Sequence, residues 1–223
     1  MCGIVGFTHL DRSVDPARIR RATRSLIHRG PDQQGVFETT TVSLGAVRLK
    51  IIDLEHGQQP MHAGPVTIVF NGEVYNHAEV RQELEALGHQ FDSRCDTEVV
   101  LRAFVQWDVE CFKRLRGMFG VALWNEAARR LVLARDRLGI KPLYIAFRNR
   151  DIYFASELKG ILEHPEIDRH LSAQGLHHYL SLNYVPCPYT LIDGVEKLRP
   201  GYWLEWREGE VRSEPYWRLN LQP

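Results

Sequence analysis

The second residue of the chain, Cys2, is the first place where this sequence could do chemistry. Once the initiator methionine is removed, Cys2 carries a thiol and a free α-amine on the same residue. An unperturbed α-amine has a pKa of about 7.7–8.0, so near neutral pH it can accept the proton of its own side chain. Position alone favours a second interpretation, in which Cys2 is a small apolar residue that begins a strand. The two interpretations are therefore an N-terminal nucleophile and a packing residue.

The remaining thiols do not suggest a metal site or a disulfide framework. Cys95, Cys111 and Cys187 are too far apart in the sequence to form a C-x-x-C pair with one another or with Cys2. The cysteine pattern therefore predicts a reduced chain that binds no metal.

The elements that must position Cys2 are predicted from periodicity and from capping residues. An apolar, β-branched strand is expected at residues 2–9, followed by a helix with Asp15 as N-cap, Pro16 at its first position and Gly30 at its end. Interleaved helices and hairpins favour an α+β protein with mostly antiparallel pairing. Further strands are expected at residues 35–39, 42–47, 66–70, 118–124, 130–135, 143–147, 153–156, 203–206 and 210–216. Further helices are expected at residues 77–88, 97–107, 157–163 and 172–182, with Asp96 as a possible N-cap.

Composition narrows the class of protein. The chain has 223 residues, of which 44% are hydrophobic and 25% charged, values that are typical of a globular domain. Lys plus Arg and Asp plus Glu number 28 each, so the net charge of zero argues against a broad nucleic-acid or membrane-surface footprint. No apolar run approaches the roughly 18 residues of a membrane span, and the N-terminus lacks the pattern of a signal peptide. A cytoplasmic chain is expected.

A series of short motifs gives Cys2 a more specific meaning. They are MCGIVGF at residues 1–7, HRGPD at 28–32, RLKIIDL at 48–54, FNGEVYN at 70–76, DTE at 96–98, GMF at 117–119, RDRLGIKPLY at 135–144, SELK at 156–159, YVP at 184–186 and RPG at 199–201. In this order they resemble the class II glutamine amidotransferases, which are N-terminal nucleophile hydrolases. HRGPD and RDRLGIKPLY are similar to the asparagine-synthetase branch of that family. The resemblance implies a four-layer α/β/β/α sandwich.

The resemblance implies catalytic roles for Cys2, Asn71 and Gly72. The family's nucleophile stands at the position of Cys2, and its oxyanion hole stands at Asn71 and Gly72. The chemistry agrees, because the Asn71 amide can donate an N–H and Gly72 lets a backbone approach closely. The alternative for this pair is a tight Asn-Gly turn between strands.

A second set of residues is implied in binding glutamine. Arg48 suits the α-carboxylate and Asp96 the α-ammonium group. The resemblance adds Glu73 and the backbone around Leu49 and Ile52, with Asn71 and Gly72 as further contacts. The alternatives are a surface charge for Arg48 and a helix cap for Asp96.

Other residues with chemical potential receive structural interpretations. His28 belongs to HRGPD, which resembles a structural loop beside the site rather than a source of a general base. The neighbouring His177 and His178 are expected on a helix without a shared metal. Cys95 is expected near the site but not as a nucleophile.

The resemblance covers one half of a two-part enzyme. We expect a glutaminase domain at residues 1–219 and the start of a linker at 220–223, because the SGGxDS signature of the family's synthetase domain is absent. No cofactor is expected in this chain, and ATP and Mg²⁺ belong to the missing domain. The expected function is hydrolysis of L-glutamine through a Cys2 thioester, with the ammonia used by an ATP-dependent synthetase domain or subunit to amidate aspartate. The alternatives are a different carboxylate acceptor and a silent docking module, and a homodimer is a further expected assembly. The chain is expected to be either a piece of a longer protein or a free-standing subunit.

Overall fold

Two antiparallel sheets form the centre of the molecule. A computed structural model describes residues 2–10, 12, 15–51 and 53–221. Every strand pair in both sheets is antiparallel. Sheet A has the order β10 (Val195–Lys197), β8 (Tyr144–Arg148), β9 (Asp151–Ala155), β1 (Gly3–Thr8), β3 (Val42–Arg48) and β2 (Gln33–Glu38). Sheet B has the order β12 (Glu210–Pro215), β11 (Tyr202–Arg207), β7 (Arg130–Arg135), β6 (Gly117–Asn125), β5 (Val66–Val74) and β4 (Met61–Ala63).

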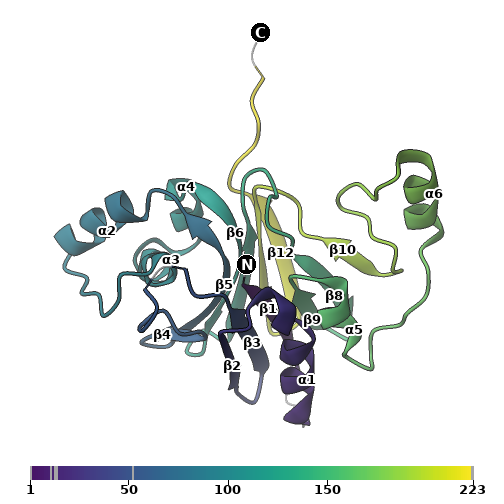
Figure 1. Ribbon diagram of the computed structural model, residues 1–223, viewed down its shortest axis with the longest axis horizontal. Helices are drawn as coiled ribbons and strands as arrows, with labels where there is room; N and C mark the ends of the chain where they lie inside the picture. Colours follow the sequence, from purple (N-terminus) through teal and green to yellow (C-terminus); the bar gives the residue numbers. More distant parts are fainter. Residues whose placement is uncertain (1, 11, 13–14, 52, 222–223) are drawn as a thin grey trace.

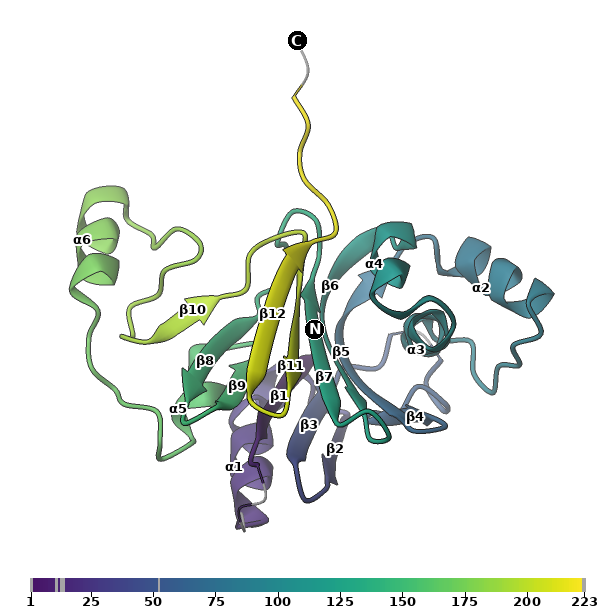
Figure 2. The ribbon, with the colours of Figure 1, turned by 180° about the vertical axis from the view of Figure 1, so that it is seen from behind.

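Helices cover the outer face of each sheet. Helices α2 (His77–Ala86), α3 (Asp96–Trp107) and α4 (Cys111–Arg114) lie beside β5 and β6, whereas α1 (Ala17–Ser25) and α5 (Leu158–Leu162) lie against sheet A (Figure 1). Short 3₁₀ turns occupy Ile27–Arg29 and Asp108–Glu110. Helix α6 (Ala173–Leu182) projects at the edge of the molecule, as the view from behind also shows (Figure 2).

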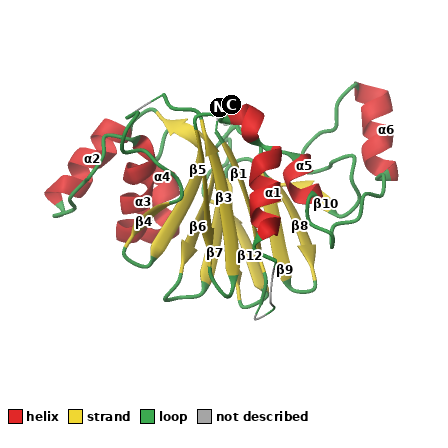
Figure 3. Cartoon of the chain, turned by 60° about the horizontal axis from the view of Figure 1, so that its bottom comes forward, coloured by secondary structure: helices red, strands yellow, loops and turns green. Residues whose placement is uncertain are grey.

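The hydrophobic core is divided into three layers by the alternation of side chains along the strands. On β6, Val121 and Leu123 pack toward the helices on sheet B, while Ala122 and Trp124 pack toward the other sheet. On β1, Ile4 faces the other sheet and its neighbour Val5 faces α1. Because side chains alternate between the two faces of a sheet, consecutive residues of one strand pack into the core layers on opposite sides of that sheet. The predicted α/β/β/α sandwich is confirmed, and Figure 3 shows helices on both sides of the stacked sheets.

Several element boundaries differ from those predicted. The first helix ends at Ser25 rather than near Gly30, and a 3₁₀ turn continues the chain. Asp96 is the first residue of α3 and not its N-cap, a place taken by Cys95 in an extended conformation. The three-residue strands β4 and β10 were not predicted, because such short strands depend on pairing with distant partners. Within the described residues, no helix is long and apolar enough to cross a membrane.

The strand register brings the start of the chain to the end of β3. Gly3 pairs with Val47, so Cys2 reaches the level of Arg48. On sheet B, Asn71 and Gly72 lie near the end of β5 and pair with Gly120 and Phe119 of β6. The ends of β1, β3 and β5 thus meet at one end of the sandwich, where the candidate site lies.

The packing of His164 gives a prediction about acid stability. His164 is only 6% exposed, and its ring contacts Phe7 and Tyr153 at centroid distances of 4.8 and 4.5 Å. Burial, with Arg18 close by, lowers the pKa of His164 to about 4. The unfolded imidazole has a pKa of about 6.5, so the unfolded state binds the proton first. The free energy of unfolding is therefore undiminished by His164 above about pH 6.5, and it decreases as the pH falls from 6.5 toward 4.

We therefore expect His164 to account for about 2–3 kcal/mol of the stability lost between pH 7.5 and pH 4.5. Urea unfolding at both pH values measures it as the difference between wild type and His164→Gln, which cannot take up the proton. Equal losses in the two proteins would contradict the prediction.

Candidate active site

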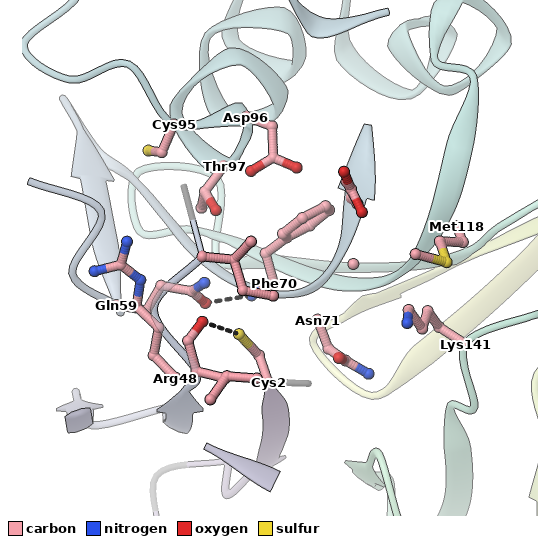
Figure 4. A pocket seen from close by; sticks show the side chains of 14 residues that line it. Cys2, Arg48, Gln59, Phe70, Asn71, Cys95, Asp96, Thr97, Met118 and Lys141 are labelled. Carbon is pink, nitrogen blue, oxygen red and sulfur yellow. Dashed lines mark hydrogen bonds between the residues drawn. The ribbon is translucent and has the colours of Figure 1, made fainter. Parts of the chain in front are cut away.

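A pocket opens where the two sheets and helix α3 meet. Figure 4 shows the side chains that line it, which come from the residue before β1, from β3, β5 and β6, from the start of α3 and from the loops after β3 and β7. Its lining comprises Cys2, Arg48, Leu49, Ile51, Gln59, Phe70, Asn71, Gly72, Glu73, Cys95, Asp96, Thr97, Met118 and Lys141. The pocket therefore collects all the predicted site residues except Ile52, which lies outside the described residues.

Cys2 is held from both its backbone and its thiol. Its carbonyl oxygen accepts a hydrogen bond from Arg29 Nε at 2.9 Å, and its Sγ donates to the Leu49 carbonyl oxygen at 3.8 Å. Burial raises the pKa of the Cys2 thiol above its ordinary value. A thiol that stays protonated near neutral pH needs a base before it can attack.

The HRGPD segment supports Cys2 without offering a base. The Arg29 side chain is 9% exposed and pairs through Nη1 with Glu157 at 2.8 Å, which fixes the guanidinium that holds the Cys2 carbonyl. His28 is half exposed and lies 3.0 Å from the same carboxylate and 3.2 Å from Lys159. His28 is therefore bound on the outside of this segment, as expected of a structural loop.

Asn71 and Gly72 lie within a strand and do not form a turn. The predicted strand at residues 66–70 continues to Val74, so the Asn-Gly turn hypothesis is wrong. A Cβ on Gly72 would come within 2.4 Å of the Met118 carbonyl oxygen, so only glycine fits beside β6 here. Asn71 Nδ2 lies 3.5 Å from Ser156 Oγ, and its Oδ1 is buried with no hydrogen-bond partner among the described residues.

Arg48 and Asp96 are buried polar groups that face the same pocket. Arg48 ends β3, is 4% exposed and donates from Nη2 to the Asp53 carbonyl oxygen at 2.6 Å. Asp96 is 6% exposed, and its Oδ2 accepts the backbone N–H of Val74 at 2.9 Å. Burial raises the pKa of Asp96, although the Val74 N–H acts in the opposite direction. A buried guanidinium and a buried carboxyl in one pocket suit the two charged groups of an amino acid.

Of the other three thiols, Cys95 lines the pocket, whereas Cys111 and Cys187 do not. All four cysteines are free, and Cys111 is fully buried in the helix layer, while Cys187 is exposed. Cys95 lines the pocket with its sulfur 2.9 Å from Ser93 Oγ, and burial raises its pKa. No group of three or more potential metal ligands occurs in the part of the chain that the structure describes.

Several lining or supporting residues received no role from sequence reasoning. Ser156 and Glu157 belong to SELK, and Lys141 belongs to RDRLGIKPLY, so the motifs marked them without saying what they contact. Asp136 of the same motif is fully buried and accepts backbone N–H groups from Phe119, Leu138, Ile140 and Lys141. It thereby shapes the turn that carries Lys141 to the pocket.

The two-sheet sandwich of this chain is the fold of a solved enzyme. It superimposes on a solved glutamine phosphoribosylpyrophosphate amidotransferase from Bacillus subtilis with a TM-score of 0.68, over 99% of this chain and 50% of that one, at 18% identity. Residues 1–217 match the family model described as a glutamine amidotransferase domain, and the chain belongs to this family.

Curated relatives are longer than this chain. It is 39% identical to asparagine synthetase [glutamine-hydrolyzing] 1 of Bacillus subtilis (strain 168), over 100% of this chain and 36% of that protein. It is 35% identical to asparagine synthetase [glutamine-hydrolyzing] 3 of the same organism, over 100% of this chain and 37% of the relative. The chain thus spans about a third of the length of these relatives.

Proposed function

We propose that this domain hydrolyses L-glutamine to glutamate and ammonia, with Cys2 as nucleophile. The observation that carries the proposal is the position of Cys2 in a pocket that also holds Arg48, Asp96, Asn71 and Gly72. These groups are what the hydrolysis of an amino-acid carboxamide requires, namely a nucleophile, oxyanion donors and a means of binding both charged ends of the substrate. Membership of the glutamine amidotransferase domain family supports it.

In the first half-reaction, the Cys2 sulfur forms a bond to the side-chain carbonyl carbon of glutamine while the thiol proton passes to the α-amine of Cys2. Asn71 Nδ2 and the Gly72 N–H stabilise the tetrahedral oxyanion. The intermediate collapses as the C–N bond breaks, the α-amine returns the proton to the leaving nitrogen, and ammonia departs. A γ-thioester remains on Cys2.

In the second half-reaction, water adds to the thioester carbonyl carbon and gives up a proton to the α-amine. The C–S bond then breaks, glutamate leaves, and the proton restores the thiol. The mechanism uses the amine twice, which requires that the initiator methionine has been removed and that the active chain begins at Cys2.

Arg48 and Asp96 determine which amide is cleaved. The Arg48 guanidinium binds the α-carboxylate of glutamine, and the Asp96 carboxylate binds the α-ammonium group. Leu49 and Glu73 complete the walls around the substrate, and Ile52 keeps its predicted role from the sequence. With both charged ends fixed, the side-chain amide reaches the Cys2 sulfur.

The ammonia is proposed to amidate aspartate in an ATP-dependent synthetase domain or subunit. The naming of the curated relatives supports this acceptor, and ATP and Mg²⁺ would bind to that partner. The experiment supplies this domain, joined to or mixed with its synthetase domain or subunit, with amide-¹⁵N glutamine, aspartate and ATP. Label in asparagine supports the acceptor, whereas release of label only as free ammonia contradicts it.

The glutaminase proposal is tested by joining intact mass to activity. We would record the mass of the chain and assay glutamate release, with and without pretreatment by a glutamine analogue that carries a thiol-reactive diazoketone. The expected result is a chain without methionine, glutamate formation, and a label on Cys2. A chain without methionine that binds glutamine but forms no glutamate would instead support the silent docking module.

A further inference from the structure

The loop at residues 49–60, described except for residue 52, runs along the pocket between β3 and β4 and is tied at three points. Near its start, the Lys50 N–H donates to Asp32 Oδ2 at 2.8 Å. Near its end, Gln59 and Gln33 exchange two hydrogen bonds of 2.7 and 3.1 Å. The tie in the middle is made by Asp53, and it is this tie that involves the substrate-binding groups.

The side chain and the backbone carbonyl of Asp53 accept hydrogen bonds from different parts of the site. Its Oδ2 accepts the backbone N–H of Arg94 at 2.8 Å, and its Oδ1 accepts the backbone N–H of His56 at 3.0 Å. Its backbone carbonyl oxygen accepts Arg48 Nη2 at 2.6 Å. The carboxylate therefore holds the segment that leads into Asp96, while the carbonyl holds the guanidinium of Arg48.

The residues packed around Arg48 restrict its side chain to one position. A Cβ on Gly57 would come within 2.2 Å of Arg48 Nη2, so the loop closes directly over the guanidinium. Arg94 is separated from Asp96 only by Cys95, which is 3% exposed. A shift of Asp53 would be transmitted to Arg48 through one hydrogen bond and to the start of α3 through another.

We propose that Asp53 is a positioning residue that sets the separation of Arg48 and Asp96 so that both ends of an α-amino acid are bound together. The inference rests on the proposed glutaminase function. It assigns the recognition of free glutamine, as distinct from a side-chain amide within a peptide, to a contact between two loops rather than to the two charged residues alone.

Two properties of Asp53 suit this role. The N–H groups of Arg94 and His56 lower the pKa of its carboxyl to about 2, so the carboxylate is present at any working pH. Its φ of 48° lies in the left-handed region, which Asp and Asn adopt more readily than most residues. Alanine would lose the hydrogen bonds and strain the backbone together, so asparagine gives the sharper test. The Asp53→Asn variant keeps the size and backbone preference but offers one acceptor oxygen for two N–H donors.

The experiment compares Asp53→Asn with Glu55→Gln, a matched loss of charge at an exposed position in the same loop. Steady-state glutamate release is measured for both, together with the rate at which iodoacetamide alkylates Cys2. For Asp53→Asn we expect KM for L-glutamine to rise about tenfold, with kcat within about threefold of wild type and alkylation unchanged. Inactivation by the diazoketone analogue, which carries the same α-groups, should slow by a factor similar to the rise in KM. Glu55→Gln should match wild type in every assay.

Two results would overturn the inference. In one, Asp53→Asn leaves KM unchanged. In the other, it lowers kcat and iodoacetamide alkylation together, which would place Asp53 at the chemistry. Calorimetric binding of L-glutamine in a Cys2→Ala background separates this test from the proposed function. If wild type releases no glutamate, the proposed function fails. If adding Asp53→Asn to Cys2→Ala weakens the binding of L-glutamine about tenfold, the positioning role is still supported.

Discussion

Replacing Cys2 with alanine is expected to abolish glutamate release, with kcat reduced by at least about 10⁴-fold. Removal of the nucleophile from a covalent hydrolase leaves only the catalysis that substrate binding and oxyanion donors provide. Because Arg48 and Asp96 lie apart from the sulfur in the pocket, L-glutamine should still bind to the variant. Calorimetry with L-glutamine and an assay for glutamate measure the two properties separately.

The matched control for this prediction is Cys95→Ser, which changes the second thiol of the same pocket. Burial raises the pKa of Cys95 as it does that of Cys2, but Cys95 lies inside the chain and has no α-amine of its own to take its proton, and its sulfur contacts Ser93 Oγ, so we do not expect it to act as the nucleophile. We expect this variant to retain kcat within about threefold and to be labelled on Cys2 by the diazoketone analogue. Undiminished turnover by the Cys2→Ala protein would remove Cys2 from the mechanism, and loss of turnover in Cys95→Ser alone would assign the chemistry to the other thiol.

The parts of the fold that could be predicted are those determined by local pattern. Two apolar runs at residues 118–124 and 130–135, separated by the short stretch 125–129, predict a hairpin that the structure confirms as β6 and β7. Residues 71 and 72 show the opposite case, because Asn-Gly is a turn pair in local terms. Pairing of Asn71 with Gly120 and of Gly72 with Phe119 keeps them in the strand. Pairing with β6 therefore overrides the local preference of the Asn-Gly pair for a turn.

The residues of the candidate site could also be predicted where a local motif marks them, but their contacts could not. Cys2, Arg48, Asn71 and Asp96 could be named because each stands in a motif, and the structure places all four around one pocket. The contacts that hold them could not be named, because they join residues far apart in the chain. Asn71 lies 85 residues from Ser156, and no spacing rule connects a strand residue to a partner at that distance. Asp53 likewise reaches Arg94 over 41 residues, so its role emerges only from the folded chain.

Replacing Asn71 with alanine is expected to lower kcat about 10²–10³-fold, or about 2.7–4 kcal/mol in the barrier, with KM little changed. The loss falls on kcat because the oxyanion forms only after attack, whereas Arg48 and Asp96 bind the ground state as well. Folding should be largely preserved, since the Asn71 side chain makes one long contact to Ser156 and its Oδ1 has no hydrogen-bond partner among the described residues. Steady-state kinetics and the melting temperature measure the two effects.

Two further variants separate oxyanion stabilisation from packing. Asn71→Asp keeps the shape of the side chain but replaces the donor with a carboxylate, so its kcat should fall at least as far as that of Asn71→Ala. Ser156→Ala removes the contact to Asn71 Nδ2 and the acceptor of the Ile4 N–H, so we expect a lower melting temperature with kcat within about tenfold of wild type. If kcat instead falls in step with melting temperature across all three variants, Asn71 is a packing residue. If kcat falls only where the amide donor is lost, the N–H of Asn71 acts on the developing oxyanion, because no other property is shared by those two substitutions alone.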